Sequence, residues 1–125
     1  MSQVNCPRAT VDVIFNTMNR DAAIASPVVA YGPANPSLKN ERFWKKKAAL
    51  WGVSVPTAQS MRCGNCKAFN VSPFVKACMG SLGSAPDTFD ELSGQFVTLG
   101  YCEAHRFKCA SSRTCNTWLH GGPTV

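Results

Sequence analysis

The stretch that organises this chain is Cys63-Gly64-Asn65-Cys66, a pair of cysteines separated by two residues. Two intervening residues let both sulfur atoms point toward one centre, and the amides between them can donate hydrogen bonds to sulfur. Gly64 relieves the tight turn that this spacing requires. Zinc knuckles, redox dithiols and iron–sulfur proteins share the motif, but no strand–helix–strand pattern surrounds it, which disfavours a redox dithiol.

Seven cysteines occur in the 125 residues, and six of them lie between residues 63 and 115. They are Cys6, Cys63, Cys66, Cys78, Cys102, Cys109 and Cys115. The first residues lack the charged and then apolar pattern of a signal peptide, so we expect the chain to stay in the reducing cytoplasm. An odd number of thiols in that compartment argues against a disulfide framework and favours metal binding.

Composition and charge limit the class of protein. Hydrophobic residues make up 45% of the chain, which suffices for one packed core, and the length is too short for two ordinary domains. No apolar run approaches the ~20 residues of a membrane-spanning helix, so we expect a soluble protein without membrane contact. The net charge of +6 permits an acidic partner. We expect no enzyme, because neither a nucleophile motif nor a phosphate-binding glycine loop occurs.

Two further cysteines lie in aromatic surroundings. Cys102 follows Gly100 and Tyr101, and Cys115 begins the run Cys115-Asn116-Thr117-Trp118. Apolar walls exclude water and raise the potential of a thiolate-bound cluster, so these surroundings favour iron–sulfur chemistry over a wet zinc site. The aromatic residues that we expect to form the shell of the cluster are Phe69, Tyr101, Phe107 and Trp118.

The pattern formed by Cys63-x2-Cys66, Gly100-Tyr101-Cys102 and Cys115-x2-Trp118 resembles that of high-potential iron–sulfur proteins over residues 58–122. It is more similar still to high-potential-like proteins of tailed bacteriophages, which share runs such as Phe43-Trp44 and Arg62–Cys66. The resemblance implies one [4Fe–4S] cluster. Its implied ligands are Cys63, Cys66, Cys102 and Cys115. It also implies a small metal-stapled fold of irregular helices and short strands.

A zinc site is the alternative. Cys63-x2-Cys66 combined with Cys102-x2-His105 has the spacing of a Cys3His site, and His120 offers a second imidazole. That interpretation gives Cys115 and Trp118 no role.

The remaining cysteines have no counterpart in the ligand set of the family. Cys78 and Cys109 are expected to be buried thiols, a disulfide or substitute ligands. Cys6, beside Pro7, is expected to be a free thiol.

The chain divides into three zones. Residues 1–36 are predicted to be an extended N-terminal arm, residues 37–62 a basic amphipathic helical segment, and residues 63–125 the cysteine-rich cluster-binding domain. Within the last zone, short helices are expected at residues 73–79 and 88–92.

The arm is expected to bind a partner. Alternation over Thr10–Phe15 predicts a short strand, and Val11, Val13 and Phe15 are the side chains expected to contact other virion proteins. In the helical segment, Trp44, Ala48 and Trp51 share one apolar face. A run of cations on one helix is usually a solvent-exposed face. The alternative is that this run contacts an acidic surface or DNA. These cations are Lys39, Arg42, Lys45, Lys46 and Lys47.

The expected function follows from the resemblance and from the small core. A region of roughly 65 residues is marginal by hydrophobic burial alone, and a metal centre is a standard remedy. We therefore expect a [4Fe–4S]-binding structural protein of a bacteriophage particle, associated with tail, connector or capsid, made in the host cytoplasm and located in the virion. The alternatives are a soluble electron-transfer protein and a zinc-binding interaction module.

Overall fold

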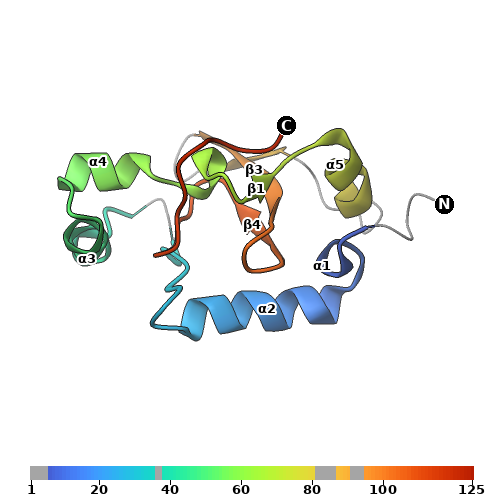
Figure 1. Ribbon diagram of the computed structural model, residues 1–125, viewed down its shortest axis with the longest axis horizontal. Coiled ribbons are helices and arrows are strands. Elements are labelled where there is room, and N and C mark those ends of the chain that lie inside the picture. Colours follow the sequence, from blue (N-terminus) through green and yellow to red (C-terminus); the bar gives the residue numbers. More distant parts are fainter. Residues whose placement is uncertain (1–5, 36–37, 81–86, 91–94) are drawn as a thin grey trace.

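The computed structural model describes residues 6–35, 38–80, 87–90 and 95–125 (Figure 1). Its helices are α1 (Arg8–Val11), α2 (Val13–Ala25), α3 (Glu41–Trp51), α4 (Val55–Ser60) and α5 (Pro73–Gly80), with a 3-10 turn, η2 (Cys63–Asn65). Its strands are β1 (Phe69–Asn70), β2 (Asp87–Asp90), β3 (Gln95–Cys102) and β4 (Phe107–Ala110). The chain is therefore a small mixed fold of helices and short strands.

One antiparallel sheet is built around the long strand β3. Strand β2 pairs with its first half, and β1 and β4 pair with its second half. The register places Phe69 and Phe107 on either side of Cys102. The strand Asp87–Asp90 corrects the prediction of a helix over residues 88–92, of which 91 and 92 lie outside the described residues. Pairing with β3 outweighs that local preference.

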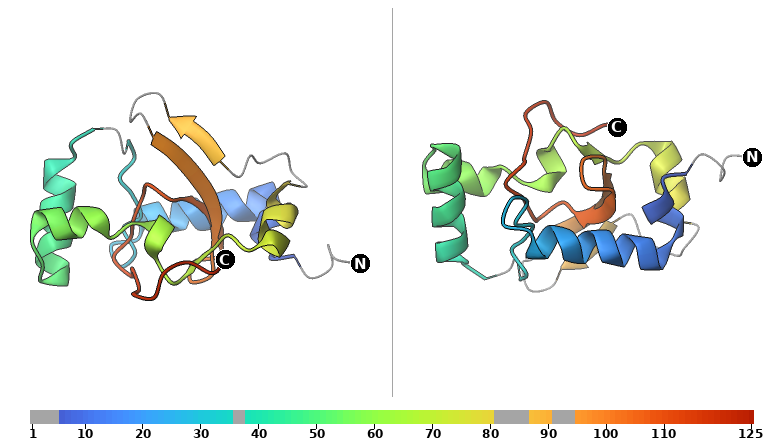
Figure 2. Two further views of the ribbon diagram at one scale, coloured as in Figure 1. Left: turned by 90° about the horizontal axis from the view of Figure 1, so that it is seen from above. Right: turned by 60° about the horizontal axis from the view of Figure 1, so that its bottom comes forward.

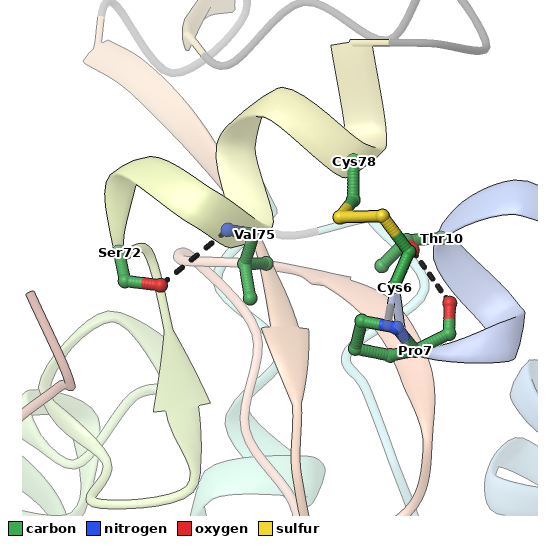
Figure 3. The surroundings of a disulfide bond; sticks show 6 residues. All are labelled: Cys6, Pro7, Thr10, Ser72, Val75 and Cys78. Atoms are coloured by element: carbon green, nitrogen blue, oxygen red, sulfur yellow. Dashed lines mark hydrogen bonds between the residues drawn. A yellow bond between two sulfur atoms is a disulfide. The ribbon is translucent and has the colours of Figure 1, made fainter. Parts of the chain in front are cut away.

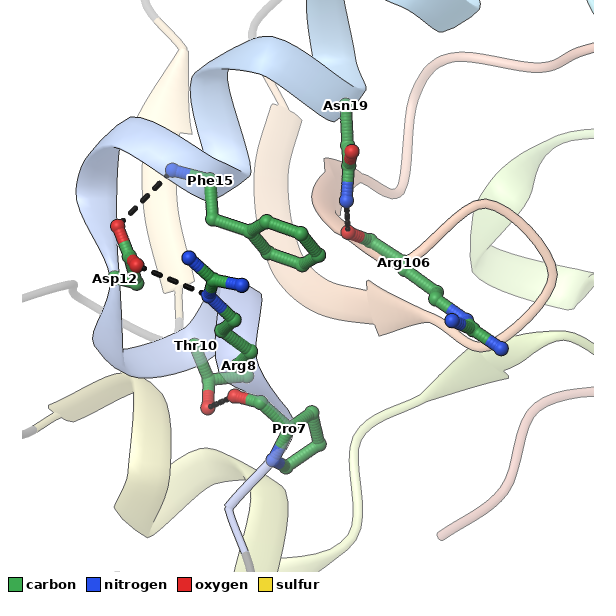
Figure 4. Close-up of polar contacts among 7 residues, drawn as sticks. All are labelled: Pro7, Arg8, Thr10, Asp12, Phe15, Asn19 and Arg106. Carbon is green, nitrogen blue, oxygen red and sulfur yellow. Dashed lines mark hydrogen bonds and ion pairs between the residues drawn. The ribbon is translucent and has the colours of Figure 1, made fainter.

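Within the N-terminal zone, Arg8–Val11 and Val13–Ala25 are helical, so the prediction of an extended arm with a strand at Thr10–Phe15 is wrong. The Asp12 carboxylate accepts a hydrogen bond from the Phe15 amide at 3.0 Å and caps α2 (Figure 4). Alternation of apolar and polar residues over only six positions is a weak signal for a strand. The Asp12 cap and the packing of the helix on the rest of the chain outweigh it. Helix α2 lies along β4 of the same chain (Figures 1 and 2).

Amide side chains hold α2 on the sheet. Asn16 Oδ1 accepts a hydrogen bond from the Lys108 amide at 2.6 Å, and Asn19 Nδ2 donates to the Arg106 carbonyl at 2.7 Å. The apolar Ile14 and Met18 face solvent instead, with 75% and 64% of their surface exposed. Helix α2 therefore places two amide side chains against the sheet and leaves some of its apolar side chains exposed.

The side chains predicted to contact a partner have different surroundings. Val11 and Val13 are exposed. Phe15 packs beside the buried Val75 and Tyr101, and the Arg8 guanidinium lies 4.4 Å from the centroid of its ring. The structure therefore uses Phe15 within this chain.

A disulfide joins the N-terminal segment to α5. It links Cys6 to Cys78, whose Cα atoms are 5.8 Å apart (Figure 3). The prediction of a free Cys6 is therefore wrong, and the partner of Cys78 is not Cys109. Helix α5 itself is confirmed, with Ser72 Oγ accepting from the Val75 amide. No spacing rule connects cysteines so far apart in sequence, because their contact comes from the packing of α1 on α5.

Helices α3 and α4 form a hairpin at one end of the molecule (Figure 1). Trp44, Ala48 and Ala58 are buried between them, and Trp51 packs on this small core. Gly52, with φ of 65°, ends α3, and Ser54 caps α4. The prediction of helices in this segment is confirmed. Among the described residues, no helix combines the length and apolarity needed to cross a bilayer.

Candidate metal centre

The four cysteines predicted as ligands meet in one pocket. Cys63 begins η2, Cys66 follows it, Cys102 ends β3, and Cys115 lies in the C-terminal segment. All four are free thiols, and each has 7–9% of its surface exposed. Segments more than fifty residues apart in sequence therefore converge on one buried, sulfur-lined site.

A fifth thiol completes the pocket. Cys109, on β4, is 2% exposed, and its thiol hydrogen-bonds those of Cys63 and Cys102. It is a free buried cysteine, which confirms one of the alternatives open from sequence. Strand pairing brings it there, because Cys109 lies opposite Gly100, two residues from Cys102 on the same face of β3.

Contacts between the thiols shift their pKa values in opposite directions. The hydrogen bond from Cys109 outweighs burial and lowers the pKa of Cys102 to about 7. Burial, followed by the contacts with Cys102 and Cys63, raises the pKa of Cys109 well above its ordinary value. Burial also raises the pKa of Cys115. Cys102 is thus the most readily ionised of these three, and thiolate is the form that binds metal.

Hydrogen-bond donors surround the sulfur atoms. The His105 amide donates to Cys102 Sγ and the Leu119 amide donates to Cys66 Sγ, both at 3.4 Å. Thr117 Oγ1 lies 3.2 Å from Cys115 Sγ. Such donors stabilise thiolates and tune iron–sulfur clusters. All of these donors lie outside the Cys63–Cys66 turn. The amides inside that turn donate hydrogen bonds to backbone carbonyls, contrary to our expectation.

The Cys63–Cys66 turn is hydrogen-bonded to the C-terminal segment. The Cys63 amide donates to the Arg113 carbonyl at 2.6 Å, and the Gly64 amide donates to the Ser111 carbonyl at 3.1 Å. A Cβ at residue 64 would lie 3.0 Å from Ser111 Cβ, so glycine allows this close approach. Trp118 Nε1 donates to the Arg62 carbonyl at 2.9 Å, which fixes the indole beside the site.

Three of the four predicted shell residues lie at this core. Phe69 and Trp118 line the pocket, and Phe107 is fully buried behind it. Tyr101 does not belong to the shell, because it packs in a separate cluster with Met79 and its neighbours. Consecutive strand residues point to opposite faces, so Tyr101 points away when Cys102 points in.

Sequence reasoning missed Tyr31. Its ring packs edge-on against Phe107 at 4.8 Å between centroids, and its hydroxyl accepts a hydrogen bond from the Ala110 amide. Burial raises the pKa of this phenol far above its ordinary value, so it stays neutral. Its position in a run of turn residues, Tyr31-Gly32-Pro33, carried no signal for a role in the core.

The geometry of the pocket limits what it can hold. Its volume of about 20 Å³ exceeds what one water needs. Among the described residues, no three His, Cys, Asp or Glu side chains are placed to hold a metal ion. His105 lines the pocket, but its Nε2 is bonded to Thr117 Oγ1 at 2.6 Å, and His120 packs against Trp118.

Comparison with protein-family models, curated proteins and solved structures finds no match to this chain.

Proposed function

We propose that this chain binds a [4Fe–4S] cluster and that the cluster stabilises a structural protein of a bacteriophage particle. The observation that carries the proposal is the convergence of separate cysteines on one buried pocket. The cluster would be held by Cys63, Cys66, Cys102 and Cys115, the positions that carry the resemblance to high-potential iron–sulfur proteins. Bound there, it would supply four metal–thiolate bonds that join η2, β3 and the C-terminal segment.

The surroundings of the thiols favour a cluster over zinc. A single tetrahedral zinc ion draws its sulfur ligands to about 3.8 Å from one another, given zinc–sulfur bonds of about 2.3 Å. In a cluster each thiolate binds a different iron, so the ligands stand farther apart. The four predicted ligands come from η2, β3 and the C-terminal segment and line one pocket, an arrangement that would suit thiolates on different irons. Apolar walls and donors to sulfur also suit it.

A structural role explains more of the molecule than electron transfer does. The pocket joins η2, β3, β4 and the C-terminal segment, so a group bound there would link most of the sheet to its surrounding loops. The disulfide strengthens the opposite side, between α1 and α5. Two covalent or metal cross-links in one small chain are typical of domains with little hydrophobic core.

The assignment to a phage particle rests on the sequence runs shared with phage proteins. Two features support it. A disulfide suits a particle that leaves the reducing cytoplasm. The exposed apolar side chains of α2, which include Val13, together with Val11 of α1, would suit contact with other virion proteins. The cations still exposed for an acidic surface or DNA are Lys39, Arg42, Lys45 and Lys46.

Metal analysis of single variants tests the cluster. The protein is purified without oxygen, and iron and acid-labile sulfide are measured for the wild type and for variants at Cys66, Cys115 and Cys6. We expect Cys66→Ser and Cys115→Ser to lose the cluster and Cys6→Ser to keep it, because Cys6 lies in the disulfide. Protein without iron or sulfide that holds zinc, keeps it in Cys115→Ser and loses it in His105→Ala, would replace the cluster with a zinc site.

The structural role is tested on particles. We expect the chain to be a component of purified virions and to bring stoichiometric iron with it. Virions that lack the chain, beside abundant free protein in the infected cell, would contradict this part of the proposal.

A further inference from the structure

Lys47 is a buried cation beside the thiol pocket. Only 3% of its surface is exposed, although it belongs to a run of lysines on α3 whose neighbours Lys45 and Lys46 face solvent. Its ammonium donates to the Ala30 carbonyl at 3.0 Å and to Asn116 Oδ1, and it lies 4.9 Å from the ring centroid of Phe43. Lys47 is therefore not part of the exposed basic face that the sequence suggested.

The ammonium has polar partners but no anionic one in the described part of the chain. The ion pairs found there are Arg8–Asp12 and Arg20–Asp21, both far from α3 in sequence. Removing a charge from water is costly unless an opposite charge compensates for it. Carbonyl and amide oxygens satisfy its hydrogen bonds and leave its charge unbalanced.

The nearest candidate for the missing charge is the thiol pocket. Asn116, which accepts from Lys47, directly follows Cys115 in the chain. Burial lowers the pKa of Lys47, and the interaction with Cys115 opposes that shift, as a neighbouring anion does. Four thiolates carry more negative charge than a zinc ion or an iron–sulfur core carries positive charge, so a loaded site is a buried anion.

We propose that Lys47 is the counter-charge of the metal-loaded thiolate site. It offsets the negative charge behind Cys115 and holds that segment through Asn116. This inference rests on the proposed function in requiring a metal bound by the thiols, but it does not require the metal to be iron.

The test separates charge from hydrogen bonding. Lys47→Met removes both, Lys47→Gln retains an amide donor without charge, and Lys46→Met is the matched control on the exposed face of the same helix. Each protein is divided into an iron–sulfide reconstitution and a zinc titration of the reduced, metal-free chain. The readouts are the reduction potential of the cluster, the dissociation constant for zinc, and melting with and without metal.

We expect both Lys47 variants to bind zinc about tenfold more weakly or worse, because close buried charges couple strongly. We also expect them to lower the reduction potential, since a lost cation disfavours the added electron. Their melting temperatures should fall more with metal than without it, and Lys46→Met should match the wild type in every readout. Unchanged zinc affinity and reduction potential, or wild-type values of both in Lys47→Gln, would show that Lys47 acts only through its hydrogen bonds and would overturn the inference.

The two proposals fail differently. If the wild type binds zinc with this dependence on Lys47 but rejects iron and sulfide, the cluster is refuted and the counter-charge stands. If iron and sulfide bind but the Lys47 variants behave as the control does, the cluster stands and the counter-charge is refuted. A wild type that binds neither metal would refute both.

Discussion

At the scale of single residues, the wall of the pocket depends on a missing side chain. The Phe69 ring lies over Gly100, and a Cβ there would lie 2.5 Å from two ring atoms. Gly100→Ala should therefore displace Phe69 and lower stability by about 1–3 kcal/mol, the usual cost of overpacking. Thermal melting measures this, with Gly80→Ala as the control because nothing lies within 4 Å of its added Cβ. Equal melting of Gly100→Ala and wild type would contradict the packing argument.

The hydrogen bond between two of the thiols also predicts how the stability of the metal-free protein depends on pH. The hydrogen bond from Cys109 lowers the pKa of Cys102 to about 7, below its value in the unfolded chain. A lowered pKa means that Cys102 adds stability above the unfolded pKa and loses it as the pH falls through about 7. Cys109→Ala should raise this pKa, whereas Cys109→Ser, which keeps a hydroxyl donor, should raise it less. The rate at which Cys102 is alkylated, followed against pH, measures the shift. Identical profiles for the three proteins would exclude the thiol hydrogen bond.

At the scale of elements, α2 is docked by hydrogen bonds. Asn16→Ala would leave the Lys108 amide without its acceptor, which should cost about 1–3 kcal/mol. Met18→Ala, on the exposed face of the same helix, should leave the melting temperature of the isolated chain unchanged. Chemical denaturation of both variants measures the difference. If Met18→Ala proves the more destabilising, the helix packs with its other face inward.

The same helix explains which elements the sequence predicts. Helices α3 and α4 follow ordinary signals, with an apolar face around Trp44, Ala48 and Trp51 and a glycine end. Helix α2 follows this pattern only in part, because Phe15 and Asn16 both pack inward, whereas Ile14 faces solvent. Hydrophobic periodicity places apolar residues on the buried side of an element. Applied to residues 10–15, it therefore does not predict a helix.

At the scale of the whole molecule, the sequence predicts part of the site and tertiary contact supplies the rest. The family resemblance implied four of the five thiols that line the pocket. Local sequence gives no signal for three residues at the site. Strand pairing brings Cys109 there, a turn brings Tyr31, and Lys47 is a buried position among exposed lysines. The place of Tyr101 was mispredicted because nearness in sequence to Cys102 does not fix the face of a strand.

We expect the N-terminal zone and the region around the thiol pocket to fold as one unit, which a deletion tests. Helix α2 covers β4, the strand that carries Cys109, and the Val29 carbonyl accepts a hydrogen bond from the Asn116 amide beside the pocket. Removing residues 1–30 therefore uncovers one side of the site and should cause aggregation or loss of bound iron. Cys6→Ser is the control, because it removes only the disulfide and should keep the iron while lowering stability by about 2–5 kcal/mol. A truncated chain that keeps its iron and its melting temperature would show instead that the zone is a separate arm.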